Sequence, residues 1–154
     1  MTNDEIISTL NDLIKVCNDG KEGFKTCAED AKLTSPDLKA LLRQREGQCA
    51  NAASELSSLV RGYGDAPTTG STAAGALHRG WLNVKTAITG KSDVAVLEEC
   101  ERGEDIAKKS YAQALEKALP PEIRVVVERQ YQGVLRNHDQ IKMLRDEAKT
   151  HAHA

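Results

Sequence analysis

The sequence predicts an all-α protein that folds as one four-helix bundle over residues 1–154. Three observations lead to this prediction. The chain of 154 residues has the usual size of a single domain. Apolar side chains recur at spacings of three, four and seven along four long segments. Aromatic residues make up only 3% of the chain, so its core must be aliphatic and alanine-rich, which favours helix packing over a β-sandwich.

The amphipathic segments predict two helical hairpins. The expected helices span about residues 3–33, 36–63, 92–118 and 121–149. Ser35 is suited to an N-cap and Pro36 to the first position of the second helix. Pro120 ends the third helix, and the fourth starts directly after it. Because both connections are short, the helices within each pair should be antiparallel neighbours. Gly20 and Gly23 weaken the first helix or admit a close neighbour.

A long connection, residues 65–91, joins the two hairpins and carries an expected short helix at about residues 74–89. A connection of this length crosses a bundle from end to end, which makes the second and third long helices parallel, as in ferritin-like bundles. On the short helix, His78, Arg79 and Trp81 form a candidate anchor. Trp81 is more typical of a side chain that fastens this helix to the bundle than of one that binds a ligand. The helix could also serve a homodimer contact.

Several stretches of the chain resemble a bacterial family of ferritin-like four-helix-bundle proteins of unknown function. The combination of GALHRGW at residues 75–81 with ERGED at residues 101–105 is the most specific, and residues 10–24 and 119–138 also match. The resemblance covers nearly the whole chain. It implies the bundle, a bacterial cytoplasm and a link to stress responses, and it implies no established activity. A shared fold is not evidence for ferritin chemistry.

The sequence departs from the pattern of a ferritin-like di-iron site. Such a site needs an inward Glu from each of two helices and a Glu-x-x-His pair from each of the other two. After Glu46 the second helix carries Cys49 where the pair requires His. In the fourth helix, the residue three positions before His138 is Leu135. A complete two-metal site is therefore not expected.

A buried polar cluster is expected instead, formed by Arg45, Gln48, Glu101, Glu104 and His138. Most of these residues interrupt otherwise apolar stripes. In the predicted topology, the four charged or imidazole side chains of this cluster lie at about one height, with a spread of about 6 Å at 1.5 Å of rise per residue. A buried charge must be paired. The sequence therefore favours a buried salt bridge in which Arg45 lies between Glu101 and Glu104, with His138 bonded to one of the carboxylates.

A metal site remains the alternative interpretation of the same cluster. Glu101, Glu104 and His138 could hold one Fe or Mn ion, because carboxylate and imidazole ligands suit these metals. The positive charge of Arg45 counts against a cation there. In the leading interpretation no cofactor is needed.

The remaining features favour a non-enzymatic structural or interaction protein. No glycine-rich phosphate loop or GxSxG motif is present. The formal net charge of −2 predicts no nucleic-acid partner. The sequence shows no signal peptide, and no apolar stretch approaches the roughly 20 residues of a membrane span, so we expect a cytoplasmic protein with no membrane contact. Its four cysteines form no CxxC pair and are expected to be reduced. The alternative is a metal-binding protein or metal-dependent oxidoreductase.

Overall fold

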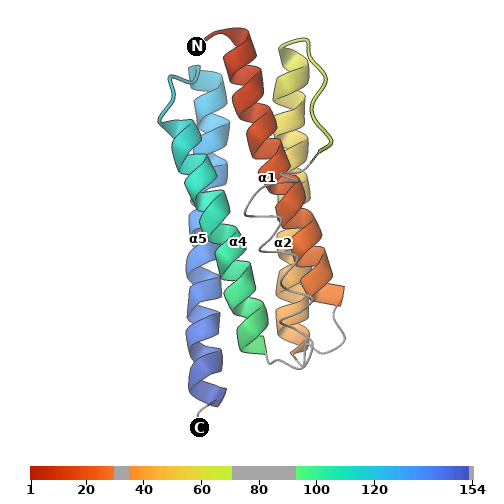
Figure 1. Cartoon of the computed structure of the whole chain (residues 1–154), viewed down its shortest axis with the longest axis vertical. Helices are drawn as coiled ribbons and strands as arrows, with labels where there is room; N and C mark the ends of the chain where they lie inside the picture. The colour runs from red at the N-terminus through yellow and green to blue at the C-terminus, as the bar shows by residue number, and fades with distance from the viewer. Residues whose placement is uncertain (30–34, 71–92, 153–154) are drawn as a thin grey trace.

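The computed structural model describes residues 1–29, 35–70 and 93–152 (Figure 1). Every regular element in this part of the chain is helical, which confirms the all-α class. The long helices are α1 (Asn3–Glu29), α2 (Pro36–Gly62), α4 (Asp93–Leu115) and α5 (Pro121–Ala152). The expected short helix at about residues 74–89, with its anchor residues His78, Arg79 and Trp81, lies outside the described residues.

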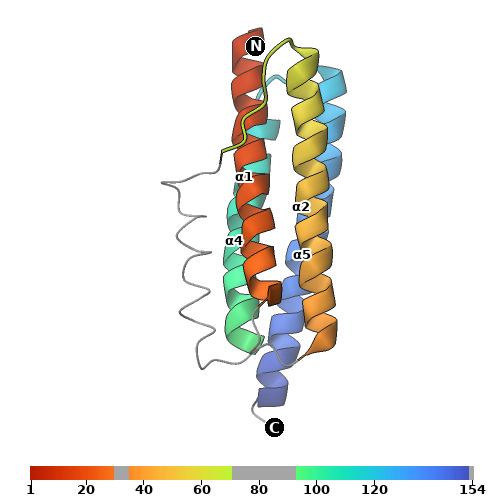
Figure 2. The same ribbon diagram turned by 90° about the vertical axis from the view of Figure 1, so that its right-hand side faces the viewer.

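The four helices lie side by side, and each is antiparallel to the two helices next to it. In Figure 1, α1 runs away from the end at which the N-terminus lies, and α2 returns toward it. Helix α4 runs in the same direction as α2, as a long connection between them predicts, and α5 runs back. Helix α1 packs against α2 and α4, and α4 packs against α5. Figure 2 shows the two layers that result, with α1 and α4 on one side and α2 and α5 on the other.

Side-chain oxygens cap the first two helices. At the start of α1, the Oγ1 of Thr2 accepts a hydrogen bond of 3.1 Å from the amide of Glu5. At the start of α2, the Oγ of Ser35 accepts a bond of 3.2 Å from the amide of Leu38, and Pro36 occupies the first turn. Both caps satisfy amides that have no partner within the helix. The boundary at Pro36 agrees with the sequence-based expectation.

Helix α4 ends at Leu115, before the expected end at residue 118. After it the chain tightens, and the amide of Lys117 bonds the carbonyl of Ala114 at 3.1 Å. From α5, the guanidinium of Arg124 donates to the carbonyls of Leu115 (3.1 Å) and Lys117 (2.6 Å). These carbonyls are among those that a helix end leaves without partners. A side chain of the next helix thus supplies the hydrogen bonds that a further turn of α4 would have made. The helical periodicity of the sequence does not predict this contact.

The buried apolar side chains form two separate clusters along the bundle axis. The upper cluster surrounds the first half of α1 and includes Leu10, Leu13, Ile14, Cys17, Leu56, Val60, Tyr111, Ile123 and Val127. The lower cluster surrounds the second half of α1 and includes Val16, Phe24, Cys27, Leu42, Val96, Leu97, Cys100 and Ile141. Both are rich in aliphatic side chains, as the composition predicts. No helix in the described part of the chain has a long enough apolar stretch to span a bilayer.

Burial should decide how much a side chain contributes to stability. Leu56 is fully buried at 0% exposure, whereas Val125 on α5 is 65% exposed. We expect Leu56→Ala to lower the free energy of unfolding by about 2–5 kcal/mol, because it removes buried methyl groups and leaves a cavity. Val125→Ala should change it by less than about 0.5 kcal/mol. Urea unfolding of both variants checks the difference, and equal losses would contradict the described packing.

Candidate functional site

A cavity of about 500 Å³ lies where the two core clusters meet. All four helices line it. Val16 and Phe24 contribute from the lower cluster, and Cys17 and Tyr111 from the upper one. The side formed by α1 and α4 is mainly apolar. The side formed by α2 and α5 carries the polar residues Gln48, Asn51, Glu55, Arg129, Gln130, Arg136 and Asn137. The cavity therefore has an apolar interior and a polar mouth at the seam between α2 and α5.

Small residues on facing helices create this space. Gly20, Ala52, Gly103, Ala107 and Gly133 all line the cavity. A Cβ placed on Gly133 would meet one heavy atom of the described residues within 4 Å, the Nη2 of Arg136 at 3.8 Å. Gly20 differs, because its Cβ would lie 3.0 Å from the Sγ of Cys49. Gly20 thus admits a close neighbour, one of the two roles expected for it, while Gly133 leaves room that nothing described fills.

Polar side chains bridge the seam between α2 and α5 around the mouth. The Nε2 of Gln130 donates to Glu55 at 2.8 Å, and the Nδ2 of Asn137 donates to Gln48 at 2.9 Å. Arg129 forms an ion pair with the same Glu55. Arg136, on the same side of α5, is exposed and has no hydrogen bond or ion pair with any residue that the structure describes. The mouth thus carries one neutralised and one unneutralised guanidinium.

A chain of hydrogen bonds runs from the interior to this mouth. The hydroxyl of Tyr111 donates to the Oε1 of Gln130 at 2.7 Å, and the Sγ of Cys17 lies 3.3 Å from the same hydroxyl. Because the phenol has already used its single proton, the Cys17 thiol is the donor in that contact. Burial raises the pKa of Cys17 to about 11 and the pKa of Tyr111 well above its usual value. Both groups are therefore neutral at physiological pH.

Glu104 is a buried carboxyl group in the wall of the cavity. Its side chain is buried, and its Oε2 has no hydrogen-bond partner among the described residues. Burial raises its pKa from 4.5 to about 8, against the lowering effect of Arg45, and the charges of Asp105 and Glu101 add to the rise. Glu104 is thus mostly a neutral carboxylic acid at pH 7, able to donate one hydrogen bond.

Arg45 is buried, as expected, but its partners are amides. Its guanidinium donates to the Oε1 of Gln48 at 3.2 Å and to Gln140 of α5, while its Nε has no partner among the described residues. No ion pair within 4.0 Å joins it to Glu101 or Glu104 in the described chain. Arg45 is on α2, which lies beside α5 and diagonally opposite α4 (Figures 1 and 2). Gln140 of α5 is therefore closer to it than the carboxylates of α4.

Glu101 and His138 also have partners other than the expected ones. Glu101 forms an ion pair with Arg145 of α5. The Nε2 of His138 lies 2.5 Å from an oxygen of Asp105, and its buried Nδ1 has no hydrogen-bond partner in the described part of the chain. The expected cluster is therefore divided, with Arg45, Gln48 and Glu104 near the cavity and Glu101 and His138 at the seam between α4 and α5.

One group of side chains at that seam has a geometry suited to a metal ion. Glu101, Asp105 and His138 each offer one ligand atom, and the three atoms lie within 4.8 Å of one another. Glu104 is not part of this group, so Asp105 takes the place that the sequence-based hypothesis gave to Glu104. Its spacing of four residues from Glu101 puts both carboxylates on one helix face, which is a signal that the ERGED motif contained. The donor set fits one ion, although the guanidinium of Arg145 already neutralises Glu101.

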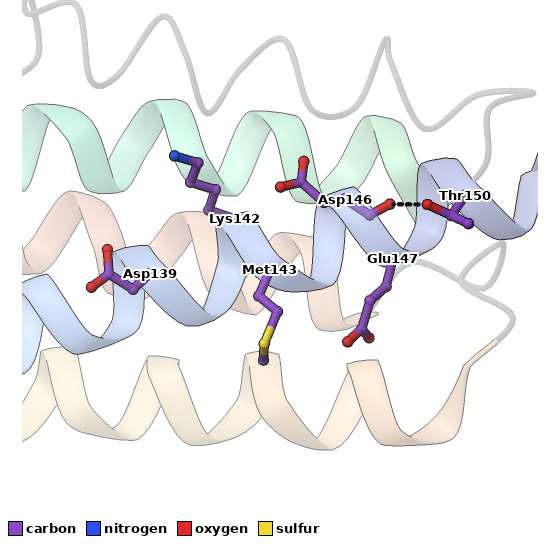
Figure 3. A pocket seen from close by; sticks show the side chains of 6 residues that line it. All are labelled: Asp139, Lys142, Met143, Asp146, Glu147 and Thr150. Atoms are coloured by element: carbon purple, nitrogen blue, oxygen red, sulfur yellow. Dashed lines mark hydrogen bonds between the residues drawn. The ribbon is translucent and has the colours of Figure 1, made fainter.

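A further hollow lies along the outer surface of α5 (Figure 3). All the side chains that line it come from this one helix: Asp139, Lys142, Met143, Asp146, Glu147 and Thr150. Figure 3 shows these side chains spread along the helix, with the Thr150 hydroxyl bonded to the carbonyl of Asp146. With no second element to enclose a ligand, this surface is a weaker candidate than the cavity.

The raised pKa of Glu104 predicts a pH-dependent stability. Between pH 4.5 and about 8 the folded protein retains a proton that the unfolded chain releases, so the free energy of unfolding falls as pH rises through this window. The loss reaches about 5 kcal/mol at most. Glu104→Gln should remove this part of the slope, measured as the difference between the two proteins in urea unfolding from pH 4 to 9.

Arg45→Met supplies a control for the same measurement. The guanidinium of Arg45 holds the pKa of Glu104 down. Without it, the upper end of the window should move above pH 8. Identical pH profiles of wild type and Glu104→Gln would show that Glu104 does not titrate in an unusual range.

Comparison with known proteins places the chain in a family. No curated protein matches it. A family model described as a domain of unknown function, DUF2383, matches residues 5–117. The match spans nearly all of α1, the whole of α2 and α4, and ends before α5. It contains the interior residues Cys17, Glu104 and Tyr111 of the cavity, while Gln130, Gly133 and Arg136 lie outside it. The chain therefore belongs to the DUF2383 family, a family of unknown function.

Proposed function

We propose that this protein is a non-enzymatic binding bundle that holds a small molecule in its central cavity. The observation that carries the proposal is a cavity of about 500 Å³ to which every described helix contributes. Ligand pockets are typically about 300–1,000 Å³ and mostly apolar, with a few polar groups that fix orientation. Helical bundles commonly build such sites between facing helices.

The state of the cavity's nucleophiles supports binding rather than catalysis. Cys17 and Cys49 both line the cavity, and burial raises the pKa of each thiol above its usual value. Since the thiolate is the reactive form of cysteine, these side chains act as small apolar groups and weak donors. The Tyr111 hydroxyl donates its proton in a hydrogen bond to Gln130, so it is not a free nucleophile either.

The proposed setting is a ferritin-like protein of the bacterial cytoplasm, with a role in stress. The parallel directions of α2 and α4 support the ferritin-like architecture. The four cysteines are free thiols, and three of them are buried, which suits a reducing compartment. The stress role rests only on the resemblance to ferritin-like families.

Metal binding is a second candidate function, favoured by the geometry of Glu101, Asp105 and His138. Carboxylate and imidazole ligands would suit Fe or Mn. These residues would hold one ion at the seam of α4 and α5, where Asp105 is 58% exposed and His138 12% exposed. A bound ion would have to displace Arg145 from Glu101, which makes this candidate weaker than the cavity.

A neutral fluorescent probe tests the cavity. N-phenyl-1-naphthylamine, whose emission rises in apolar sites, should bind the wild-type protein. Gly133→Leu should abolish this binding, because the new side chain would project into the open space beside Arg136, where the nearest described atom to its Cβ is 3.8 Å away. The matched control is Gly47→Leu, at an exposed glycine of α2 with no described atom near its Cβ position.

Both glycine substitutions should also stabilise their helices by about 0.5–1 kcal/mol, so lost binding by Gly133→Leu would not reflect unfolding. Probe binding that survives in Gly133→Leu, or that disappears equally in Gly47→Leu, would contradict a ligand site in this cavity.

Elemental analysis tests the metal candidate separately. The protein should be purified without a metal-affinity tag after growth with Fe, Mn and Zn. Stoichiometric metal in the wild type that is lost in His138→Ala, and retained in Gly133→Leu, would support the site at Glu101, Asp105 and His138. Metal-free wild-type protein under all three conditions would eliminate it.

A further inference from the structure

Two arginines line the mouth of the cavity, and one of them has no ion pair with any described residue. Arg129 is already paired with Glu55 across the seam. Arg136 lies two turns further along α5, on the same side, and has no partner among the described residues. Its Nη2 lies 3.8 Å from where a Cβ of Gly133 would be, so the guanidinium is at the edge of the open space. One cation is thus available to a ligand at the mouth.

The opposite side of the cavity is unsuited to a charged ligand group. Val16 and Phe24 form apolar wall there. Cys17 and Tyr111 are neutral, and the raised pKa of Glu104 leaves its carboxyl mostly protonated at pH 7. Transferring an ion into such surroundings without a partner is strongly unfavourable. A ligand that used both environments would therefore have an apolar body inside and an ionic group only at the mouth.

We propose that the cavity binds an amphiphilic carboxylic acid, with its apolar body between α1 and α4 and its carboxylate on Arg136. This inference rests on the proposed function, because it requires that the cavity take a small molecule. A planar guanidinium fork matches a carboxylate in two parallel hydrogen bonds. With Arg129 neutralised by Glu55, the mouth supplies one net positive charge from its arginines, which suits a monoanion better than a phosphate dianion.

Three ligands with the same chain length test the assignment. Decanoate, decanol and decylamine are titrated against bound N-phenyl-1-naphthylamine at low ionic strength. For the wild type we expect decanoate to bind about fivefold more tightly than decanol, as a partly exposed ion pair allows. Decylamine should bind more weakly than decanol, because Arg136 repels it.

Two arginine substitutions separate a specific contact from general charge. Arg136→Gln should remove the preference for decanoate over decanol, measured as the ratio of the two affinities. Arg61→Gln removes an exposed arginine from the last turn of α2, outside the cavity, and should keep the preference.

The outcomes separate this inference from the proposed function. Equal affinities for decanoate and decanol, or tighter binding of decylamine, would overturn the carboxylate assignment and leave a cavity that binds neutral molecules. A decanoate preference that persists in Arg136→Gln would overturn the role of Arg136. Failure of the fluorescent probe and all three chains to bind would overturn the proposed function itself.

Discussion

The meeting of small residues from all four helices is the constraint on which the rest of this structure depends. Gly20, Ala52, Gly103, Ala107 and Gly133 line one space, which lies between two aliphatic clusters. Protein interiors normally pack to crystal-like density, so a gap of this size needs either a ligand or a compensating arrangement. At Gly20 the Cys49 thiol fills the space, whereas at Gly133 it stays open. The two core clusters meet at this space, and the polar seam and the buried carboxyl of Glu104 border it.

Polar groups around the space fall into two energetic classes. The first class is a chain of hydrogen bonds and an ion pair that runs from the interior to solvent, so its central members have defined partners. Its members in order are Cys17, Tyr111, Gln130, Glu55 and Arg129. Glu104 and Arg45 each leave one buried polar atom without a partner in the described chain. Buried polar groups of this kind lower stability unless something satisfies them. Proteins tolerate such costs mainly at functional sites, which is why the cavity is the stronger candidate.

One turn of α4 contributes side chains to both candidate sites. Successive residues of a helix project about 100° apart, so Glu104 and Asp105 face different neighbours. Glu104 lines the cavity, while Asp105 lies beside Glu101 and His138 at the seam with α5. The ERGED motif thus supplies acidic groups to two environments that differ in burial and in nearby cations. Arg145 neutralises Glu101 in one of them, and Arg45 acts on Glu104 from a greater distance in the other.

Apolar periodicity and turn chemistry by themselves determined the all-α class, the start of α2 at Pro36 and the burial of Arg45 and Glu104, because these features depend on residues close in sequence. The partners of the buried charges depended on tertiary structure. A helical stripe shows which face a side chain shares, but not which helix lies opposite. Arg45 therefore meets Gln140 rather than a carboxylate, and Arg124 closes the end of α4 from another helix. The cavity depended most on the fold, since it forms only where small residues from four segments distant in sequence lie at the same height along the bundle axis.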